Sequence, residues 1–170
     1  MLTLITGGAS SGKSDFAERL VCRLPGEKIY LATMEPFGEE NLSRITRHRE
    51  KRKNKGFVTV ECSTDIGGLV LPKGANVLLE DLPNLLANEM FSASGNGGEN
   101  LTEELLMLSA RCASLTVVTG DLFSGDIHYE GDMLLYLQRL AQCGNALAQK
   151  ADLAVEVVCC VPNILKGRIP

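Results

Sequence analysis

Short apolar runs alternate along the chain with segments in which apolar residues are spaced three and four positions apart. The apolar runs, each typical of a buried strand, lie at residues 2–6, 29–32, 57–61, 77–80, 116–119 and 154–161. The segments with helical spacing lie at residues 15–24, 40–53, 83–91, 101–113 and 132–150. Strands that alternate with helices predict an α/β fold, in which a mostly parallel sheet is covered by helices on both faces.

The first predicted strand and the first predicted helix are joined by the sequence GGASSGKS at residues 7–14. It matches the phosphate-loop (P-loop) pattern GxxxxGKS, and a strand before it and a helix after it are the context that the pattern requires. Glycines let consecutive backbone N–H groups point inward around a phosphate, and the helix adds its positive N-terminal end. This predicts a nucleoside triphosphate site formed by Gly7, Gly8, Ala9, Ser10, Ser11, Gly12, Lys13 and Ser14. Lys13 would reach the outer phosphates, and the Ser14 hydroxyl would bind Mg²⁺.

Residues that follow the apolar runs are further candidates, because ligands of open parallel sheets bind at the carboxyl ends of the strands. Glu80 ends one such run and is followed by Asp81. An acid in this place holds Mg²⁺, usually through water, in phosphate-loop proteins, so Glu80 and Ser14 are the predicted metal residues. Asp121 follows another run, and Thr33 either lines the nucleotide or caps a turn.

Size and composition favour one domain that spans residues 1–170. The chain has 45% apolar residues, enough for a full core, and no apolar run long enough to span a membrane. The lack of such a run predicts a cytoplasmic protein. The six cysteines form no CxxC pair, which predicts buried free thiols. The net charge of −4 argues against general affinity for nucleic acids.

Residues 43–55 form a basic segment, which carries seven of the seventeen Lys and Arg residues. Several of these cations share one helical face, which fits either a solvated charged helix or a ridge that binds phosphates. His48 lies among them, where the neighbouring positive charges favour the neutral, nucleophilic imidazole. It could attack the α-phosphate of a nucleoside triphosphate and hold the nucleotide as a phosphoramidate. A surface histidine without a role is the alternative.

Five groups of residues occur in an order that resembles one known family. They are residues 6–14, Tyr30-Leu31-Ala32-Thr33, Arg44-Ile45-x-x-His48-x-x-x-Arg52, Thr59-x-Glu61 and Leu78-Leu79-Glu80. Together they resemble the bifunctional adenosylcobinamide kinase and adenosylcobinamide-phosphate guanylyltransferase family of cobalamin biosynthesis. The phosphate loop alone fits many families, whereas the arginine, isoleucine and histidine spacing about thirty residues downstream narrows the choice.

The resemblance implies a RecA-like P-loop NTPase fold, a homo-oligomer that is commonly a trimer, and two successive reactions. ATP or GTP phosphorylates adenosylcobinamide, a corrinoid, and GMP is then transferred from GTP to that phosphate through His48. The catalytic residues are therefore His48 and Lys13. Besides the loop, the implied nucleotide contacts are Ala32, Thr33, Met34, Arg49, Glu50, Lys51, Arg52, Glu61 and Glu80.

Two other functions stay open on the sequence. Residues 119–121 read Thr-Gly-Asp where the family has Thr-Asn-Glu, so the second half of the chain departs from the family pattern. A different small-molecule P-loop kinase would use the basic segment to bind an anionic acceptor, with no role for His48. A nucleotide-binding protein without turnover would keep the loop and lose the chemistry.

Overall fold

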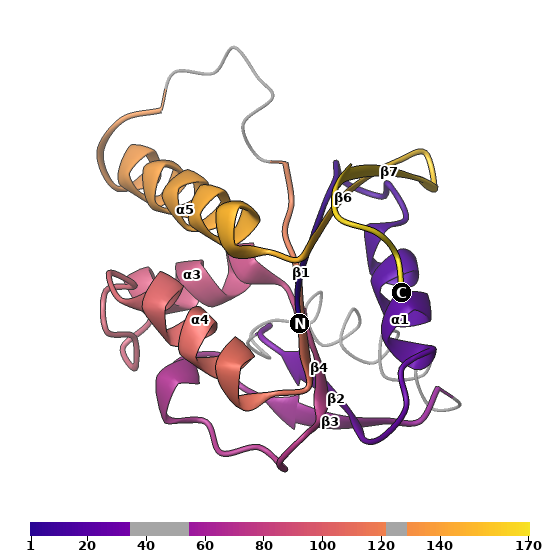
Figure 1. Ribbon diagram of the computed structural model, residues 1–170. Helices are drawn as coiled ribbons and strands as arrows, with labels where there is room; N and C mark the ends of the chain where they lie inside the picture. Colours follow the sequence, from indigo (N-terminus) through magenta and orange to yellow (C-terminus); the bar gives the residue numbers. More distant parts are fainter. Residues whose placement is uncertain (35–54, 122–128) are drawn as a thin grey trace.

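The structure, a computed structural model, describes residues 1–34, 55–121 and 129–170 and is built on one seven-stranded sheet (Figure 1). The strands are β1 (Leu2–Thr6), β2 (Lys28–Ala32), β3 (Phe57–Glu61), β4 (Asn76–Glu80), β5 (Ser114–Val118), β6 (Leu153–Val158) and β7 (Val161–Lys166). Their order is β3-β2-β4-β5-β1-β6-β7. All neighbouring pairs are parallel except β6 and β7, so the prediction of a mostly parallel sheet is confirmed.

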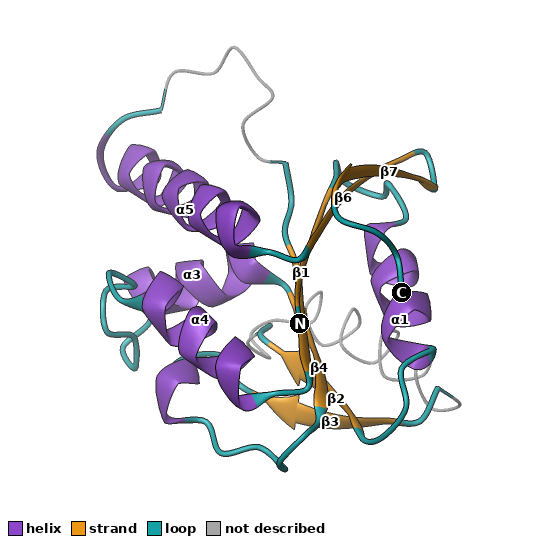
Figure 2. Cartoon of the chain, in the orientation of Figure 1, coloured by secondary structure: helices purple, strands orange, loops and turns teal. Residues whose placement is uncertain are grey.

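Helices cover both faces of the sheet, as predicted (Figure 2). Helix α1 (Lys13–Cys22) lies on one face, and α3 (Leu82–Phe91), α4 (Leu101–Arg111) and α5 (Gly131–Lys150) lie on the other. A short 3-10 helix, η1 (Ile66–Gly68), precedes β4. The helix predicted at residues 40–53 lies outside the described residues. None of the helices in the described ranges is long and apolar enough to cross a membrane.

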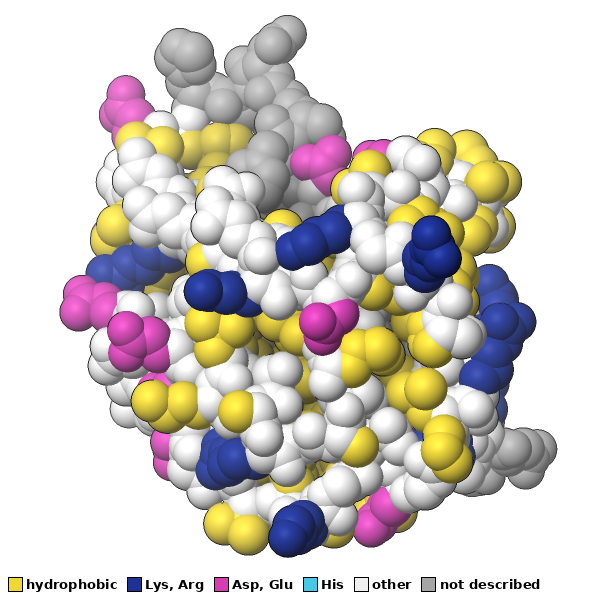
Figure 3. Space-filling view, in the orientation of Figure 1, with side chains coloured by type: hydrophobic (Ala, Val, Ile, Leu, Met, Phe, Trp, Pro, Cys, Tyr) yellow, Lys and Arg dark blue, Asp and Glu magenta, His cyan; other side chains and the backbone are white. Residues whose placement is uncertain are grey.

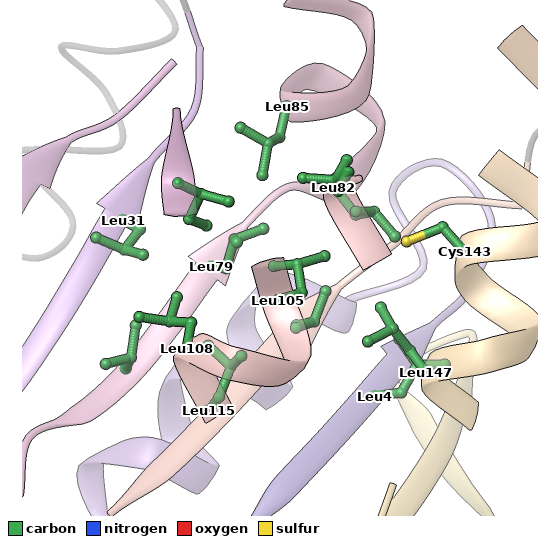
Figure 4. Packing of buried hydrophobic residues seen from close by; sticks show 14 of the residues in the cluster. Leu4, Leu31, Leu79, Leu82, Leu85, Leu105, Leu108, Leu115, Cys143 and Leu147 are labelled. Atoms are coloured by element: carbon green, nitrogen blue, oxygen red, sulfur yellow. The ribbon is translucent and has the colours of Figure 1, made fainter. Parts of the chain in front are cut away.

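Each face of the sheet has its own hydrophobic core. On the side of α3, α4 and α5, Leu79 and Leu115 of the sheet lie against Leu105 and Leu108 of α4 (Figure 4). On the side of α1, neighbouring strand positions such as Leu78 pack with the buried side chains of the helix. Successive side chains of a strand point to opposite faces, so a strand covered on both sides must be apolar throughout. This is why the buried strands are visible as continuous apolar runs.

The end of the chain differs from the sequence prediction. One strand was expected over residues 154–161, but β6 ends at Val158 and the chain returns as the antiparallel strand β7. Cys159 and Cys160 make the two-residue turn, with φ angles of 48° and 65°. Such turns usually contain asparagine or glycine, since both residues take the left-handed conformation. Because no such residue marks this turn, the hairpin was missed.

All six cysteines are free thiols, as predicted, but they are not all buried. Cys62 and Cys143 are buried, and Cys22 and Cys112 are partly buried. Cys159 and Cys160 are exposed, so the prediction of buried thiols is wrong for this pair. The hairpin turn brings them to the surface, where the predicted continuous strand would have kept them in the sheet.

Candidate functional site

The loop between β1 and α1 is a closed turn whose tip is exposed to solvent. Gly7 and Ser11 are buried, whereas residues 8–10 are exposed. The backbone N–H of Ser11 donates to the Gly8 carbonyl at 3.3 Å, which closes the turn. Gly12 is the N-cap residue of α1 and has no side chain with which to cap the helix. Backbone N–H groups of the first helical turn therefore point toward the loop, as in an anion-binding site.

Gly7 and Gly12 are required both by their backbone conformation and by close packing. Their φ angles are 153° and 89°, which disfavour residues with a Cβ atom. A Cβ atom at Gly7 would lie 2.4 Å from the carbonyl oxygen of Val157, at the end of β6. A Cβ atom at Gly12 would lie 2.8 Å from the sulfur of Cys160. The two glycines of the motif thus let the loop sit directly on the β6–β7 hairpin.

Lys13 and Ser14 are the first two residues of α1, directly after the loop. The Lys13 ammonium donates to the Gly8 carbonyl at 3.0 Å, so its charge lies at the loop itself. The Ser14 side chain lies close enough to the carboxyl of Glu80, at the end of β4, to lower the pKa of that carboxyl. The hydroxyl of Tyr30 donates to Glu80 Oε2 at 3.1 Å. The fold thus brings together the two residues, Ser14 and Glu80, that the sequence analysis assigns to a metal.

The environment of Glu80 disfavours its ionised form. Burial raises the pKa of the Glu80 carboxyl above its ordinary value. The hydroxyls of Ser14 and Tyr30 lower this pKa, while the nearby carboxylates of Asp81 and Glu18 raise it further. A cation beside the Glu80 oxygens would therefore compensate for charge that the protein itself stabilises poorly.

Ser14 and Glu80 fit a magnesium ion that is shared with a nucleotide. A hydroxyl and a carboxylate are hard oxygen ligands, and Mg²⁺ usually takes one or two such groups and completes its shell with phosphates and water. Within residues 1–34, 55–121 and 129–170, no group of three or more His, Cys, Asp and Glu residues could hold a metal. The pair therefore suits a nucleotide-bound ion better than a metal held by the protein alone.

Other predicted contacts line up along the carboxyl edge of the sheet. Glu61 of β3 lies opposite Ala32 of β2, which in turn lies opposite Glu80 of β4. Glu61 is exposed, and Ala32 and Met34 are partly exposed. Strand β5 separates β4 from β1. The loop that follows β1 and Glu80, the last residue of β4, therefore lie two strands apart. The register therefore places Glu61, Ala32 and Glu80, three predicted nucleotide contacts, side by side at the carboxyl ends of the strands.

Thr33 has a clear structural role. It is fully buried, and its hydroxyl accepts from the N–H of Asp81 at 2.8 Å and donates to the carbonyl of Asp81 at 3.0 Å. The Asp81 carboxylate accepts from the N–H of Asn84 at 2.9 Å and so caps α3. The Thr33 hydroxyl thus joins the ends of β2 and β4, a structural role that the sequence analysis did not predict. Its contact with a nucleotide stays a prediction.

Comparison with known proteins assigns the chain to a family. The family model described as cobinamide kinase / cobinamide phosphate guanyltransferase matches residues 3–165. The chain belongs to this family. Its α/β fold with a mostly parallel sheet is the class that the sequence predicts, and the family resemblance stated from the residues is confirmed.

Two relatives share the name bifunctional adenosylcobalamin biosynthesis protein CobU. The one from Salmonella typhimurium is 30% identical over 145 residues, which cover 74% of this chain and 77% of the relative. The one from Escherichia coli K12 is 33% identical over 99 residues, which cover 56% of this chain and 54% of the relative. A solved structure from Pyrococcus horikoshii OT3 has a TM-score of 0.53, with 10% identity and coverage of 98% of this chain and 86% of that one. This last similarity concerns the fold alone.

The basic segment of this family member is described only at its end. His48, Arg49, Glu50, Lys51 and Arg52 lie outside the described residues, so their roles stay predictions. Lys55 is described, and its ammonium forms an ion pair with the buried carboxylate of Glu18 on α1. The segment is therefore anchored, at its C-terminal end, to the helix that begins at the phosphate loop. The sequence contained no signal for this pair, because the two residues are 37 positions apart.

A cavity of about 320 Å³ adjoins the loop on the opposite face of the sheet. It lies between α5 and the carboxyl ends of β1, β5 and β6, and its polar lining residues are Thr6, Thr119, Asp121, Asn145 and Glu156. The N–H of Asp121 donates to the Gly7 carbonyl at 3.2 Å, which ties the cavity wall to the first residue of the loop. Residues 119–121, where the sequence departs from the family pattern, thus line this cavity.

The environment of Glu80 predicts how stability depends on pH. Well below its ordinary pKa of 4.5, the carboxyl is protonated in both the folded and the unfolded chain, so it has no effect there. As pH rises above that value, the unfolded chain loses the proton more readily, and the folded state becomes less stable. Glu80→Gln does not titrate, so its free energy of unfolding should exceed that of the wild type increasingly from acid to neutral pH.

The measurement is chemical denaturation of both proteins, without nucleotide or divalent ions, across that pH range. Glu103→Gln, on the exposed face of α4, is the matched control and should show no such growing difference. A Glu80→Gln variant that is less stable than the wild type at neutral pH would contradict the prediction.

Proposed function

We propose that this protein phosphorylates adenosylcobinamide with ATP or GTP and then transfers GMP from GTP to the product through His48. The observation that carries the proposal is the approach of Ser14, directly after the loop, to the Glu80 carboxyl, in a chain that belongs to the cobinamide kinase / cobinamide phosphate guanyltransferase family. Both relatives bear a name that refers to adenosylcobalamin biosynthesis.

In the first reaction, the protein positions the nucleotide and neutralises charge. The hydroxyl oxygen of the corrinoid's side chain attacks the γ-phosphorus, and the nucleoside diphosphate leaves. Charge develops on the phosphate oxygens during this transfer. The backbone N–H groups of the loop, the Lys13 ammonium and a Mg²⁺ ion at Ser14 and Glu80 would stabilise that charge. Mg²⁺, when bound, supplies the main electrostatic stabilisation of the transferred phosphoryl group.

In the second reaction, an imidazole nitrogen of His48 attacks the α-phosphorus of GTP, and pyrophosphate leaves. The phosphate of the corrinoid then attacks the same phosphorus, which releases His48 and forms a diphosphate bridge to the guanosine. The implied cations of residues 49–52 would hold the phosphates. The ion pair between Lys55 and Glu18 supports this assignment, because it joins the end of the basic segment to the P-loop helix.

Assembly and location belong to the same proposal. A homo-oligomer, with a trimer as the form implied by the family, would act on a nucleoside triphosphate and a corrinoid in the cytoplasm. The free thiols of all six cysteines fit a reducing compartment.

The test is product analysis of the purified protein with Mg²⁺, adenosylcobinamide and either ATP alone or ATP with GTP. ATP alone should yield adenosylcobinamide phosphate, and addition of GTP should convert it to the guanylylated corrinoid with release of pyrophosphate. Chelation of Mg²⁺ should stop both reactions. Phosphorylation of other small molecules but not of adenosylcobinamide would instead indicate a different kinase, and GTP binding without consumption would indicate a protein without turnover.

A further inference from the structure

The turn of the β6–β7 hairpin carries two adjacent, exposed thiols. Cys159 and Cys160 are the two turn residues, and both are exposed, unlike the other four cysteines. The hairpin also carries exposed apolar side chains, which gather on this part of the surface in Figure 3 and include Val158, Val161 and Leu165. Both cysteines of the turn are therefore exposed to solvent.

Cys160 is in direct contact with the phosphate loop, beside which the hairpin lies in Figure 1. Its backbone N–H donates to the carbonyl of Ser11 at 2.8 Å. A Cβ atom added at Gly12 would lie 2.8 Å from the Cys160 sulfur, 3.2 Å from its Cα and 3.4 Å from its Cβ. The whole residue thus packs on Gly12, while Val157 packs in the same way under Gly7. The end of β6 and the turn form a floor beneath both glycines of the motif.

This contact orients an N–H group that the phosphate site uses. The peptide bond between Ser11 and Gly12 is trans, so its C=O and N–H point in opposite directions. Because the Ser11 carbonyl points to Cys160, the Gly12 N–H points away from Cys160. The hydrogen bond from Cys160 therefore helps to fix the direction of a backbone donor at the start of α1, where a phosphate would bind.

The turn has little freedom to accommodate a larger group at Cys160. It consists of two residues only, both in the left-handed conformation, and Val158 pairs with Val161 directly beside it. A substituent on the Cys160 sulfur must therefore either displace the hairpin or push against Gly12. Both changes alter the hydrogen bond that holds the Ser11 carbonyl.

We propose that Cys160 is a covalent modification site, at which small-molecule disulfides attach and weaken nucleotide binding. The Cys160 thiol gives its proton to water, and its sulfur attacks one sulfur of the disulfide. A new S–S bond forms as the old one breaks, and the other half of the reagent leaves as a thiolate. The Cys160 sulfur is oxidised and the leaving half is reduced, so no other oxidant takes part. Soft alkylating reagents react at the same sulfur without oxidation.

Cys159 does not readily displace the attached group. The Cα atoms of adjacent residues are about 3.8 Å apart across a trans peptide, whereas those of ordinary disulfides are about 4.4–6.8 Å apart. A bond between Cys159 and Cys160 is thus disfavoured by geometry. The mixed disulfide at Cys160 persists until a small thiol in solution reverses it, which makes the modification reversible.

The experiment uses the full chain, oxidised glutathione as the reagent and a fluorescent GTP analogue as the binding probe. Intact mass and peptide mapping identify the modified cysteine, and titration gives the dissociation constant before and after treatment. Modification at Cys160 should raise the dissociation constant about tenfold, the loss expected when a well-packed contact is forced apart. Treatment with dithiothreitol should restore it. Cys159→Ser should respond like the wild type, whereas Cys160→Ser should bind the probe equally well before and after treatment.

A reciprocal measurement separates this effect from general damage. If modification weakens nucleotide binding about tenfold, saturating nucleotide must lower the equilibrium constant for mixed-disulfide formation by the same factor. Full modification of Cys160 with unchanged affinity would overturn the proposal and leave the nucleotide site intact. Equal loss of affinity in treated Cys160→Ser, or no reaction at Cys160, would overturn it too. A protein that binds no nucleotide before treatment would overturn both the nucleotide site and this proposal.

Discussion

Lys13→Ala is expected to reduce turnover of ATP and GTP by at least about 100- to 1,000-fold in both reactions, the loss typical of a donor aimed at developing charge. The Lys13 ammonium lies at the loop, where it donates to the Gly8 carbonyl at 3.0 Å. It is a mobile point charge at the end of a flexible side chain, which can move from that carbonyl to the phosphates of a nucleotide. Since both reactions start from a triphosphate in the same loop, both should be affected.

The fold should survive this substitution. Lys13 is partly exposed, and among the described residues its side chain donates to the exposed backbone carbonyl of Gly8. The measurement is kcat for the formation of each corrinoid product, together with the melting temperature of the variant. Arg19→Ala, which removes an exposed cation from the same helix, is the control and should leave kcat unchanged. Wild-type rates in Lys13→Ala would contradict the assignment of residues 7–14 as the nucleotide loop.

His48→Ala is expected to abolish GMP transfer and to leave phosphorylation of adenosylcobinamide in place. Loss of a nucleophile costs an enzyme about 10,000-fold or more in rate, because the covalent route is closed. Phosphorylation does not pass through His48, since the corrinoid hydroxyl attacks the γ-phosphate directly. The wild type incubated with GTP and Mg²⁺ should gain the mass of one GMP, and this adduct should be lost in mild acid, as a phosphoramidate would be. The variant should gain no such mass.

The chain offers a matched control for this experiment. His128 is the other histidine, and it lies in a polar stretch without neighbouring Lys or Arg residues. His128→Ala should therefore keep both the adduct and GMP transfer. Equal loss of both reactions in His48→Ala would contradict the separate roles of the two steps. A GMP adduct that persists in His48→Ala would place the nucleophile elsewhere.

The strands and helices that the sequence predicted share one property. Each is recognised from a pattern of apolar residues within its own short segment. The buried strands are continuous apolar runs, and the described helices show the spacing of a helix that packs on one side. The last hairpin lacks such a local pattern. Cys159 and Cys160 have no turn preference, and Pro162 argues against a strand unless it lies at an edge, which is where β7 runs. Their conformation depends on pairing with β6, so it could not be predicted from neighbouring residues.

The candidate site also has features that neighbouring residues predict and features that depend on distant elements. Gly7, Gly12, Lys13 and Ser14 identify a phosphate loop from sequence alone, because all four lie within eight consecutive residues. The acid at Glu80 was predictable from its place at the end of an apolar run. Its raised pKa was not, because burial and the partners Tyr30 and Glu18 come from other elements.

By itself, the sequence determined the succession of the described strands and main helices as far as β6, the phosphate-loop motif, and the family resemblance on which the proposed function rests. These depend on spacing along the chain, which is the same in the folded and the unfolded protein. Only the tertiary structure decided which groups meet. It placed Ser14 against Glu80, Lys55 against Glu18, and Cys160 beneath Gly12. Such contacts follow from strand order and helix packing, which sum many weak interactions over the whole chain.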